Sequence, residues 1–342
     1  MKTFRVGIVG CGAIFPMHAQ SLKNIRRARL EAVCDIKPGL AKARAKAYSC
    51  RPYSDYSEML KKESLDVVHI CTPHYLHAPM AIEAVRMGAN VIVEKPIAIH
   101  PKDAGRAIEA AKKNNVSLGV IFQNRFNPGS RLVKKSLEAG TLGKIKAGRI
   151  IMSYHKSDEY YKKSGWKGTW DKEGGGVVID QAIHFIDLVR WFARDSVEYV
   201  EANVSNRMHK SIEVEDCAEG IIKFKGGAYI CFYLINFYSY DDDAAIELDC
   251  EKGRVNIVKD AARIGLYNGR VVSAKPGKDE YIDYGNGVKD YWGYCHYNQI
   301  KDFYDSLRRS KKPSVTGLDG LKTQEVIWAI YESSRRKKKI YL

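Results

Sequence analysis

Three side chains in this sequence are of the types that move protons and stabilise developing charge. Lys95 follows a short apolar run, whereas Asp180 and His184 lie four residues apart, after three consecutive glycines. A histidine can accept a hydroxyl proton near neutral pH, and a lysine ammonium can stabilise the alkoxide that forms. The four-residue spacing predicts that Asp180 and His184 share one face of a helix. Asp180 would orient substrate hydroxyls or stabilise the imidazolium, and Asp187 is a second possible partner.

A glycine-rich turn follows the first apolar run of the sequence, Phe4 to Val9. Gly10 permits a tight turn, and Gly12 lets the backbone approach a pyrophosphate that sits at the N-terminus of the next helix. Phe15 stands where this pattern usually has a third glycine or an alanine. The turn residues expected to contact a dinucleotide are Gly10, Gly12, Ala13 and Ile14.

Asp35 ends the second apolar run, 25 residues after Gly10. A carboxylate at this place accepts hydrogen bonds from the adenosine ribose and repels a 2′-phosphate, so the sequence predicts NAD in preference to NADP. Lys37 and Arg44 are cations nearby that could weaken this preference. Asp35 could also cap the helix that begins near Pro38, and the two roles are compatible.

Apolar runs and helix-like segments alternate through the first third of the sequence. The predicted strands are 4–9, 30–34, 66–71, 90–93 and 117–122, and the predicted helices are 17–27, 38–47, 78–87 and 101–113. This alternation predicts βαβ units, and therefore a parallel sheet covered by helices on both faces. Such sheets bind ligands outside the carboxyl ends of their strands, which is where Gly10, Asp35 and Lys95 lie.

The pattern changes after about residue 124, where short strand-like segments, taken as consecutive antiparallel strands, begin to dominate. The helices predicted among and after these strands are 176–192, 291–308 and 317–333. We therefore predict an α/β protein in which residues 1–123 form a doubly wound Rossmann domain. Residues 124–342 would form an α+β domain with a large, mostly antiparallel open sheet. Gln123 and Arg125 end the last Rossmann strand, and we expect Gln123 to face the cofactor and Arg125 the substrate.

Several of these segments occur together, and in the same order, in one family of oxidoreductases. The matching segments are Gly7 to Ala13, Cys71-Thr72-Pro73 with His77, Glu94-Lys95-Pro96, and Gly174 to His184. The sequence thus resembles the Gfo/Idh/MocA family, which is named after glucose-fructose oxidoreductase and inositol dehydrogenase. The resemblance implies a Rossmann domain followed by an α/β domain whose exposed sheet commonly builds dimers or tetramers.

The resemblance also implies roles for individual residues. The catalytic lysine, aspartate and histidine of the family correspond to Lys95, Asp180 and His184, which would also contact the substrate. Trp166-Lys167 is similar to the family's Trp-Arg cofactor contact, with lysine in place of arginine. The remaining residues expected along the cofactor are Thr72, Pro73, His77, Glu94 and Lys95.

The bulk composition restricts the partners of the protein. Its net charge is +16, but the basic residues gather in the last helix or are spread over other helices, so we expect no nucleic-acid partner. No apolar run approaches the roughly 18 to 20 residues of a membrane span, and no signal peptide is recognisable. A cytoplasmic protein with eight reduced cysteines is therefore predicted. His74 and His77 could form a metal-binding pair, but the sequence offers no third or fourth ligand, so no metal is expected.

These observations predict reversible oxidation of a secondary alcohol on a sugar, a sugar derivative or a cyclitol, by a homodimer or homotetramer. Two alternatives remain open. Relatives in the family oxidise a sugar transiently at C3 and then eliminate across its glycosidic bond. A regulatory protein that senses the cofactor is the other alternative, although it would have no need of Lys95, Asp180 and His184. His296 could line the same cleft or pack among aromatic residues.

Overall fold

A computed structural model describes residues 3–277, 284 and 295–342. Backbone contacts divide the chain into two compact units. The first comprises Met1–Gln123 and Glu280–Leu321, and the second comprises Asn124–Asp279 and Lys322–Leu342. The sequence-based boundary after Gln123 coincides with one of these division points. Residues 280–321, which the sequence pattern assigns to the second domain, belong to the first unit.

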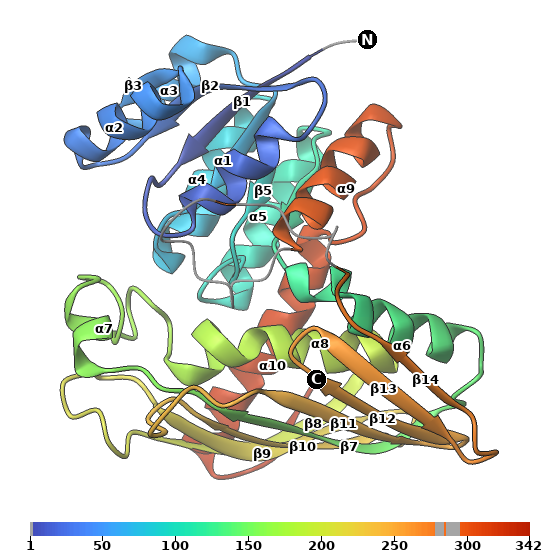
Figure 1. The fold of residues 1–342 in the computed structure, drawn as a ribbon. Coiled ribbons are helices and arrows are strands. Elements are labelled where there is room, and N and C mark those ends of the chain that lie inside the picture. The colour runs from blue at the N-terminus through green and yellow to red at the C-terminus, as the bar shows by residue number, and fades with distance from the viewer. Residues whose placement is uncertain (1–2, 278–283, 285–294) are drawn as a thin grey trace. The chain divides into compact units, whose positions relative to one another are not determined.

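The first unit contains a six-stranded parallel sheet in the order β3-β2-β1-β4-β5-β6 (Figure 1). Its strands are β1 (Phe4–Val9), β2 (Ala28–Cys34), β3 (Arg51–Tyr53), β4 (Val67–Ile70), β5 (Asn90–Val93) and β6 (Leu118–Val120). The strand order reverses direction between β1 and β4, and ligands of doubly wound sheets bind at this switch point. The predicted Rossmann architecture is confirmed.

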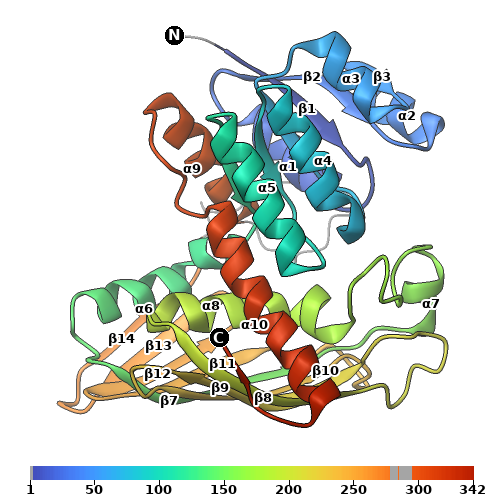
Figure 2. The same cartoon turned by 180° about the vertical axis from the view of Figure 1, so that it is seen from behind.

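Helices cover both faces of this sheet. They are α1 (Phe15–Lys23), α2 (Pro38–Tyr48), α3 (Tyr56–Glu63), α4 (His74–Arg86), α5 (Pro101–Lys113) and α9 (His296–Arg308). Helix α1 packs beside α9, and α4 packs beside α5 on the opposite face of the sheet (Figures 1 and 2). Both faces of the strands are therefore buried, which explains their nearly continuous apolar runs.

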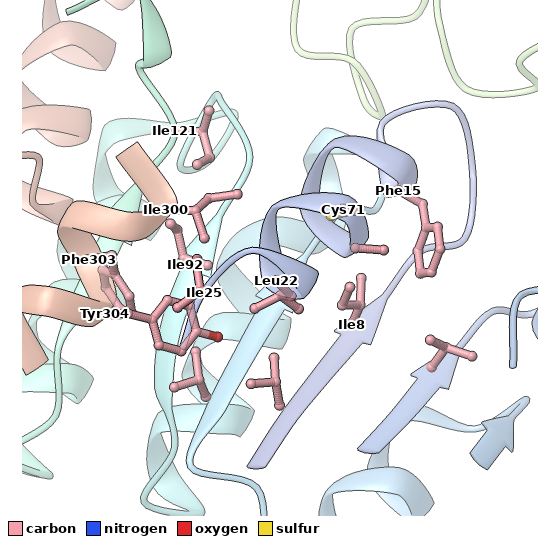
Figure 3. Packing of buried hydrophobic residues seen from close by; sticks show 14 of the residues in the cluster. Ile8, Phe15, Leu22, Ile25, Cys71, Ile92, Ile121, Ile300, Phe303 and Tyr304 are labelled. Atoms are coloured by element: carbon pink, nitrogen blue, oxygen red, sulfur yellow. The ribbon is translucent and has the colours of Figure 1, made fainter. Parts of the chain in front are cut away.

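Helix α9 belongs to the first unit because its apolar side chains complete the core of that unit. Ile300, Phe303 and Tyr304 are buried in one cluster with Ile8 of β1 and Leu22 of α1 (Figure 3). The helix begins more than 270 residues after these partners in the sequence, and no local pattern relates them. Part of its predicted range, 291–294, lies outside the described residues.

The second unit is built on a nine-stranded sheet in the order β14-β13-β12-β11-β7-β10-β9-β8-β15. Its strands are β7 (Ile145–Ser153), β8 (Val197–Ser205), β9 (Cys217–Phe224), β10 (Tyr229–Ile235), β11 (Ala245–Cys250), β12 (Gly253–Val258), β13 (Ala261–Leu266), β14 (Val271–Ala274) and β15 (Ile340–Tyr341). Strands β7 and β10 run parallel to each other, while all other neighbours are antiparallel. The prediction of a mostly antiparallel sheet is confirmed.

Helices cover one face of this sheet (Figure 1). They are α6 (Pro128–Glu138), α8 (Ile183–Ala193) and the part of α10 (Gly317–Arg336) that belongs to the second unit, while the short helix α7 (Asp158–Lys162) lies in a long connection. Two further turns are a 3₁₀ turn at Gln123–Phe126 and a π-helical turn at Val178–Ala182 that leads directly into α8. Within the described residues, the opposite face carries no helix (Figure 2).

Two short elements of the first unit have no counterpart in the sequence-based prediction. Strand β3 has three residues, including Pro52, which is a poor strand former. Helix α3 has eight residues and is capped by Asp55, whose carboxylate accepts the amide of Glu58. Both are too short for apolar periodicity to reveal them. Among the residues that the structure describes, no helix has the length and apolar character needed to cross a membrane.

Candidate active site and cofactor site

The glycine turn after β1 approaches the end of β4 closely at Gly10 and is open at Gly12. Gly10 has a φ of +91°, and a Cβ atom there would collide with the backbone carbonyl of Cys71 at the end of β4. Gly12 has open space on the side where a Cβ would project. Glycine is thus required at position 10 by the fold, whereas at position 12 it leaves the backbone accessible. Of the next two residues, Ala13 is exposed, and Ile14, the N-cap residue of α1, is half-buried.

Phe15 has a packing role that explains its departure from the usual glycine pattern. Its ring is fully buried and makes an edge-to-face contact with Tyr48 of α2, with ring centroids 5.4 Å apart. The guanidinium of Arg44 lies 5.3 Å from the ring centroid. The aromatic ring therefore packs between α1 and α2, so phenylalanine at this position serves packing.

Asp35 is held rigidly at the carboxyl end of β2. One carboxylate oxygen accepts the amide of Cys11 in the glycine turn at 2.9 Å, and the other accepts the amide of Lys37 at 2.8 Å. The residue at the N-cap position of α2 is Lys37, so Asp35 does not cap this helix in the usual way. The adjacent Ile36 side chain is 84% exposed and offers an apolar surface beside the carboxylate.

His77 connects the loops that follow β4 and β5. Its ring is fully buried, with Nε2 at 2.7 Å from the carbonyl oxygen of Thr72 and Nδ1 at 2.6 Å from that of Pro96. Burial lowers the pKa of His77, while the two carbonyl oxygens act in the opposite direction. Both ring nitrogens are engaged by the backbone, so His77 shapes the loop that carries the half-buried Lys95. Thr72 and Pro73 are themselves half-buried.

Glu94 precedes Lys95 but its carboxylate is almost fully buried. Oxygen Oε1 is 2.9 Å from Nε2 of His18 and 3.3 Å from Nε2 of His296, and Oε2 accepts the amide of Lys95 at 3.3 Å. Although burial raises the pKa of Glu94, hydrogen bonds from the two histidines hold it well below its usual value. The side chain of Glu94, which the sequence places along the cofactor, is thus committed to these contacts.

His296 was expected either to line a cleft or to pack among aromatic residues. The structure buries it and pairs it with Glu94 in the first unit. Gln123 is also buried, in the 3₁₀ turn that follows β6.

Asp180 lies in the second unit, in the π-helical turn before α8. Its Oδ2 accepts hydrogen bonds from Nζ of Lys167 at 2.5 Å, from the Tyr160 hydroxyl at 2.7 Å and from Nε2 of Gln181 at 2.6 Å. The Lys167 ammonium also lies 4.9 Å from the ring centroid of Tyr160 and 4.6 Å from that of Trp166. The structure therefore places Lys167, which we expected at the cofactor, against the predicted catalytic aspartate.

Glu173 is a second acid of this cluster that sequence patterns do not reveal. Its carboxylate is fully buried, accepts the amide of Gly168 at 2.5 Å and lies 3.3 Å from Nζ of Lys167. Burial raises the pKa of Glu173 to about 7, and the nearby Asp180 acts in the same direction, while the Lys167 charge opposes the shift. Two acids therefore share one buried ammonium group.

Glu215 holds the start of the helix that carries Asp180 and His184. Its carboxylate accepts the amides of Gly176 at 2.9 Å and Val178 at 3.0 Å, and also the Tyr331 hydroxyl at 2.9 Å. Burial raises the pKa of Glu215 to about 7, although these donors oppose the shift. A Cβ atom on Gly176 would collide with the Glu215 carbonyl, so this approach requires glycine. No sequence motif marks Glu215, because its partners are about 40 and 116 residues away.

His184 is half-buried in the first turn of α8. The sequence argument assumed one continuous α-helix from 176 to 192, but the turn through Asp180 has the i→i+5 pattern of a π-helix. Asp180 and His184 are therefore not separated by regular α-helix alone. The prediction that they share one helix face, which rests on α-helical periodicity, does not apply strictly here. Short π-helical turns within helices are frequent at functional sites, because they re-aim side chains at some cost in stability.

Arg125 is not exposed in the manner expected of a substrate ligand. Its guanidinium makes a two-pronged ion pair with Asp187, with distances of 2.7 and 2.6 Å, and both side chains are at most 3% exposed. Thr323 of α10 donates a further hydrogen bond to Asp187. This pair joins the start of the second unit to α8.

No group of three or more histidine, cysteine or acidic side chains that could hold a metal ion occurs among the described residues. All eight cysteines have free thiols. The rings of His74 and His77 are 5.7 Å apart, but both nitrogens of His77 are engaged by carbonyl oxygens.

Comparison with known proteins matches both parts of the chain to one family. Residues 4–122 match the model of the GFO/IDH/MocA oxidoreductase family with an NAD-binding Rossmann fold, and residues 130–256 match the model of the family's C-terminal domain. The chain is 27% identical to a myo-inositol 2-dehydrogenase of Thermotoga maritima, over 99% of this chain and 98% of the relative. It is 24% identical to a D-apiose dehydrogenase of Paraburkholderia graminis, over 100% of this chain and 90% of the relative.

A solved structure is similar over the full length as well. The WlbA dehydrogenase from Bordetella pertussis, in complex with NADH and UDP-GlcNAcA, has a TM-score of 0.87 and 29% identity, covering 100% of this chain and 98% of that one. The two family models lie over the two structural units, and the relatives span nearly the whole chain. The protein therefore belongs to the GFO/IDH/MocA family and is an NAD(P)-dependent oxidoreductase.

Proposed function

We propose that this enzyme transfers a hydride between a secondary alcohol of a sugar, sugar derivative or cyclitol and NAD. The observation that carries the proposal is the environment of Asp180. Its buried carboxylate accepts three hydrogen bonds, including one from a buried ammonium, in the turn that leads to His184. This arrangement surrounds the acid with hydrogen-bond donors and fixes its orientation, four residues before a histidine.

Three residues have proposed roles in the reaction. His184 takes the proton of the substrate hydroxyl, and Lys95 stabilises the oxyanion as it develops. Asp180 orients substrate hydroxyls and thereby selects the carbon that is oxidised. A nicotinamide bound at the glycine turn would supply the hydride acceptor, so that each turnover would release one proton and one carbonyl product.

The residues of the glycine turn fit a dinucleotide. The open side of Gly12 admits a pyrophosphate at the N-terminus of α1, and the fixed carboxylate of Asp35 suits the adenosine ribose hydroxyls. We propose NAD as the preferred cofactor because the carboxylate of Asp35 would repel a 2′-phosphate. Thr72 and Pro73 follow the neighbouring strand β4, and His77 lies in the first turn of α4. We propose that these residues line the cofactor.

The relatives suggest which alcohols to test. Inositol and apiose are named for two curated relatives, and UDP-GlcNAcA is bound in the WlbA structure. We propose a panel of inositols, free sugars and UDP-linked sugars, with NAD and NADP reduction followed at 340 nm. Net NADH formation with one of them supports the proposal. A cleaved glycoside without net NADH would instead show transient oxidation.

Variants test the proposed roles on the best substrate of the panel. Lys95→Ala and His184→Ala should abolish turnover while NADH binding, measured by fluorescence titration, is largely retained. Lys102→Ala and His100→Ala are the matched controls, because both side chains are exposed at the start of α5. Wild-type rates in both site variants would disprove the assignment.

We also propose that the enzyme is a homodimer or homotetramer that pairs through the helix-free face of the nine-stranded sheet. Neighbouring residues Ile151 of β7 and Tyr233 of β10 are 36% and 47% exposed on strands whose alternate residues are buried. Light scattering after gel filtration should give a multiple of 38.6 kDa. A monomeric mass at all concentrations would refute this pairing. The predicted cytoplasmic location is tested by cell fractionation.

A further inference from the structure

We propose that four buried side chains of the first unit, Tyr304, His69, His18 and Glu94, form a one-directional hydrogen-bond relay that positions Lys95. Every donor in this relay points towards the Glu94 carboxylate. His18 and His69 are therefore positioning residues with fixed and opposite tautomers. The role assigned to Lys95 rests on the proposed function, whereas the tautomers are a property of the fold alone.

The relay is continuous and its distances are short. The Tyr304 hydroxyl lies 2.9 Å from Nε2 of His69. Nδ1 of His69 lies 2.9 Å from Nδ1 of His18, and Nε2 of His18 lies 2.9 Å from Oε1 of Glu94. Each contact thus has the length of an ordinary hydrogen bond. Four elements that are distant in the sequence contribute: α1, β4, the end of β5 and α9.

Simple accounting of hydrogens determines the direction of the relay. A carboxylate only accepts, so Nε2 of His18 must carry a hydrogen. A neutral imidazole has one N–H, which leaves Nδ1 of His18 as an acceptor for the Nδ1 hydrogen of His69. Nε2 of His69 then accepts, and the Tyr304 hydroxyl donates to it. His18 is consequently the Nε2–H tautomer and His69 the Nδ1–H tautomer.

The surroundings support neutral histidines. His18, His69 and Tyr304 are all fully buried, and Glu94 is 7% exposed. Burial lowers the pKa of His18, against the opposing pull of Glu94, and lowers that of His69 well below its usual value. The anion at the end of the relay is shared with His296, which approaches Oε1 from α9 at 3.3 Å. The negative charge of Glu94 is therefore stabilised by two histidine side chains, one from α1 and one from α9.

The relay reaches Lys95 through the second oxygen of Glu94. Oxygen Oε1 contacts Nε2 of both His18 and His296, and Oε2 accepts a hydrogen bond from the amide of Lys95 at 3.3 Å. The orientation of the carboxylate therefore fixes the start of the loop that carries the proposed catalytic ammonium. Catalytic groups must be held close to the position in which they react. Hydrogen bonds from surrounding residues, such as those that hold Glu94, can fix the backbone next to such a group.

The tautomers can be observed directly in the full-length protein. Selective ¹⁵N labelling of histidine and long-range ¹H–¹⁵N spectra distinguish protonated from unprotonated ring nitrogens, and the His18→Gln and His69→Asn variants assign the signals. We expect only Nε2 of His18 and only Nδ1 of His69 to be protonated, unchanged between pH 6 and pH 8. A doubly protonated His18, or the same tautomer in both rings, would overturn the relay.

A matched pair of variants tests the positioning role. Tyr304→Phe removes the first donor of the relay, and Tyr56→Phe removes another buried hydroxyl of the same unit, which donates to the Met80 carbonyl at 3.0 Å. We expect Tyr304→Phe to shift the His69 Nε2 signal and to lower kcat by about threefold to tenfold with little change in KM, because the loop loses precision. The control should leave both unchanged.

The outcomes separate the two proposals. Equal kcat values in the two tyrosine variants would overturn the positioning role even if the tautomers are as expected. If Lys95→Ala retains activity while the tautomers and the Tyr304→Phe shift are as expected, the proposed function fails but the relay in the fold stands, without its role at Lys95.

Discussion

The ammonium nitrogen of Lys167 lies 2.5 Å from Oδ2 of Asp180, and both side chains are largely buried. A buried carboxylate beside a buried cation stays charged, and removal of one partner leaves the other charge without compensation. Lys167 replaces the arginine that the family resemblance implies at this position. The shorter reach of a lysine to a single oxygen suits the observed contact, since an arginine would present a two-pronged fork.

The first prediction concerns this ion pair. Lys167→Met should lower the free energy of unfolding by about 3 kcal/mol, because Asp180 is left buried and uncompensated. The double variant with Asp180→Asn should recover part of this loss in urea unfolding. The control is Lys163→Met, whose side chain is 79% exposed and should change stability by less than about 0.5 kcal/mol. An equal loss in both lysine variants would show that the pair contributes nothing specific.

The pH dependence of stability should report Glu173. Its pKa is about 7 in the folded protein because burial disfavours the charged form, and its ordinary value is 4.5. The folded protein therefore binds more protons than the unfolded chain between these values, so stability falls as the pH rises from about 4.5 to 7, by at most about 3 kcal/mol.

Glu173→Gln should make this part of the profile shallower, as measured by urea unfolding at several pH values. It should not flatten it, because burial also raises the pKa of Glu215 to about 7. The exposed Glu159, which pairs with Lys163, supplies the control variant Glu159→Gln. Its profile should follow that of the wild type. If both variants keep the wild-type slope, Glu173 does not hold a proton at neutral pH.

The two glycines of the phosphate turn should respond differently to alanine. Gly10→Ala should destabilise the fold by about 1–3 kcal/mol, because its φ of +91° is strained for alanine and the Cβ meets the Cys71 carbonyl. Gly12→Ala should fold normally but bind NADH about tenfold or more weakly, since its methyl group occupies the space for the pyrophosphate. Thermal melting and NADH titration separate the two effects. Full NADH affinity in Gly12→Ala would contradict this location of the pyrophosphate.

Cofactor preference should depend on Asp35. Asp35→Ser removes the charge that would repel a 2′-phosphate, so the ratio of kcat/KM for NADP to that for NAD should rise by about tenfold or more. The control is Asp55→Ser at the exposed N-cap of α3, where serine is also a good cap. An unchanged ratio in Asp35→Ser would place the determinant elsewhere.

Local patterns were sufficient for much of the first unit. Strands β1 and β5 have the predicted bounds, because a short apolar run between a polar start and a turn is typical of a buried parallel strand. Gly10, Asp35 and Lys95 could be proposed as site residues because the chemistry of such sheets occurs at strand ends, which are local features of the sequence. The alternation of strands and helices then determined the architecture.

Other features depend on contacts between distant segments. The packing of α9 with α1, the pair Arg125–Asp187 and the capping of the Asp180 turn by Glu215 each join residues that no periodicity relates. Arg125 illustrates the difference, since its position at a strand end suggested a substrate ligand, whereas a buried acid on α8 takes its guanidinium. Sequence spacing reports only the local backbone.

The sequence by itself thus determined the fold class and located the glycine turn and the residues proposed for catalysis, because these follow from periodicity and from strand-end positions. Only the tertiary structure decided what each polar side chain contacts. It turned the helix at Asp180 into a π-helical turn, gave that aspartate Lys167 as its partner and enclosed Glu94 among histidines. The physical reason is that a buried charge must find its donors within hydrogen-bond distance, and the fold alone determines which residues come that close.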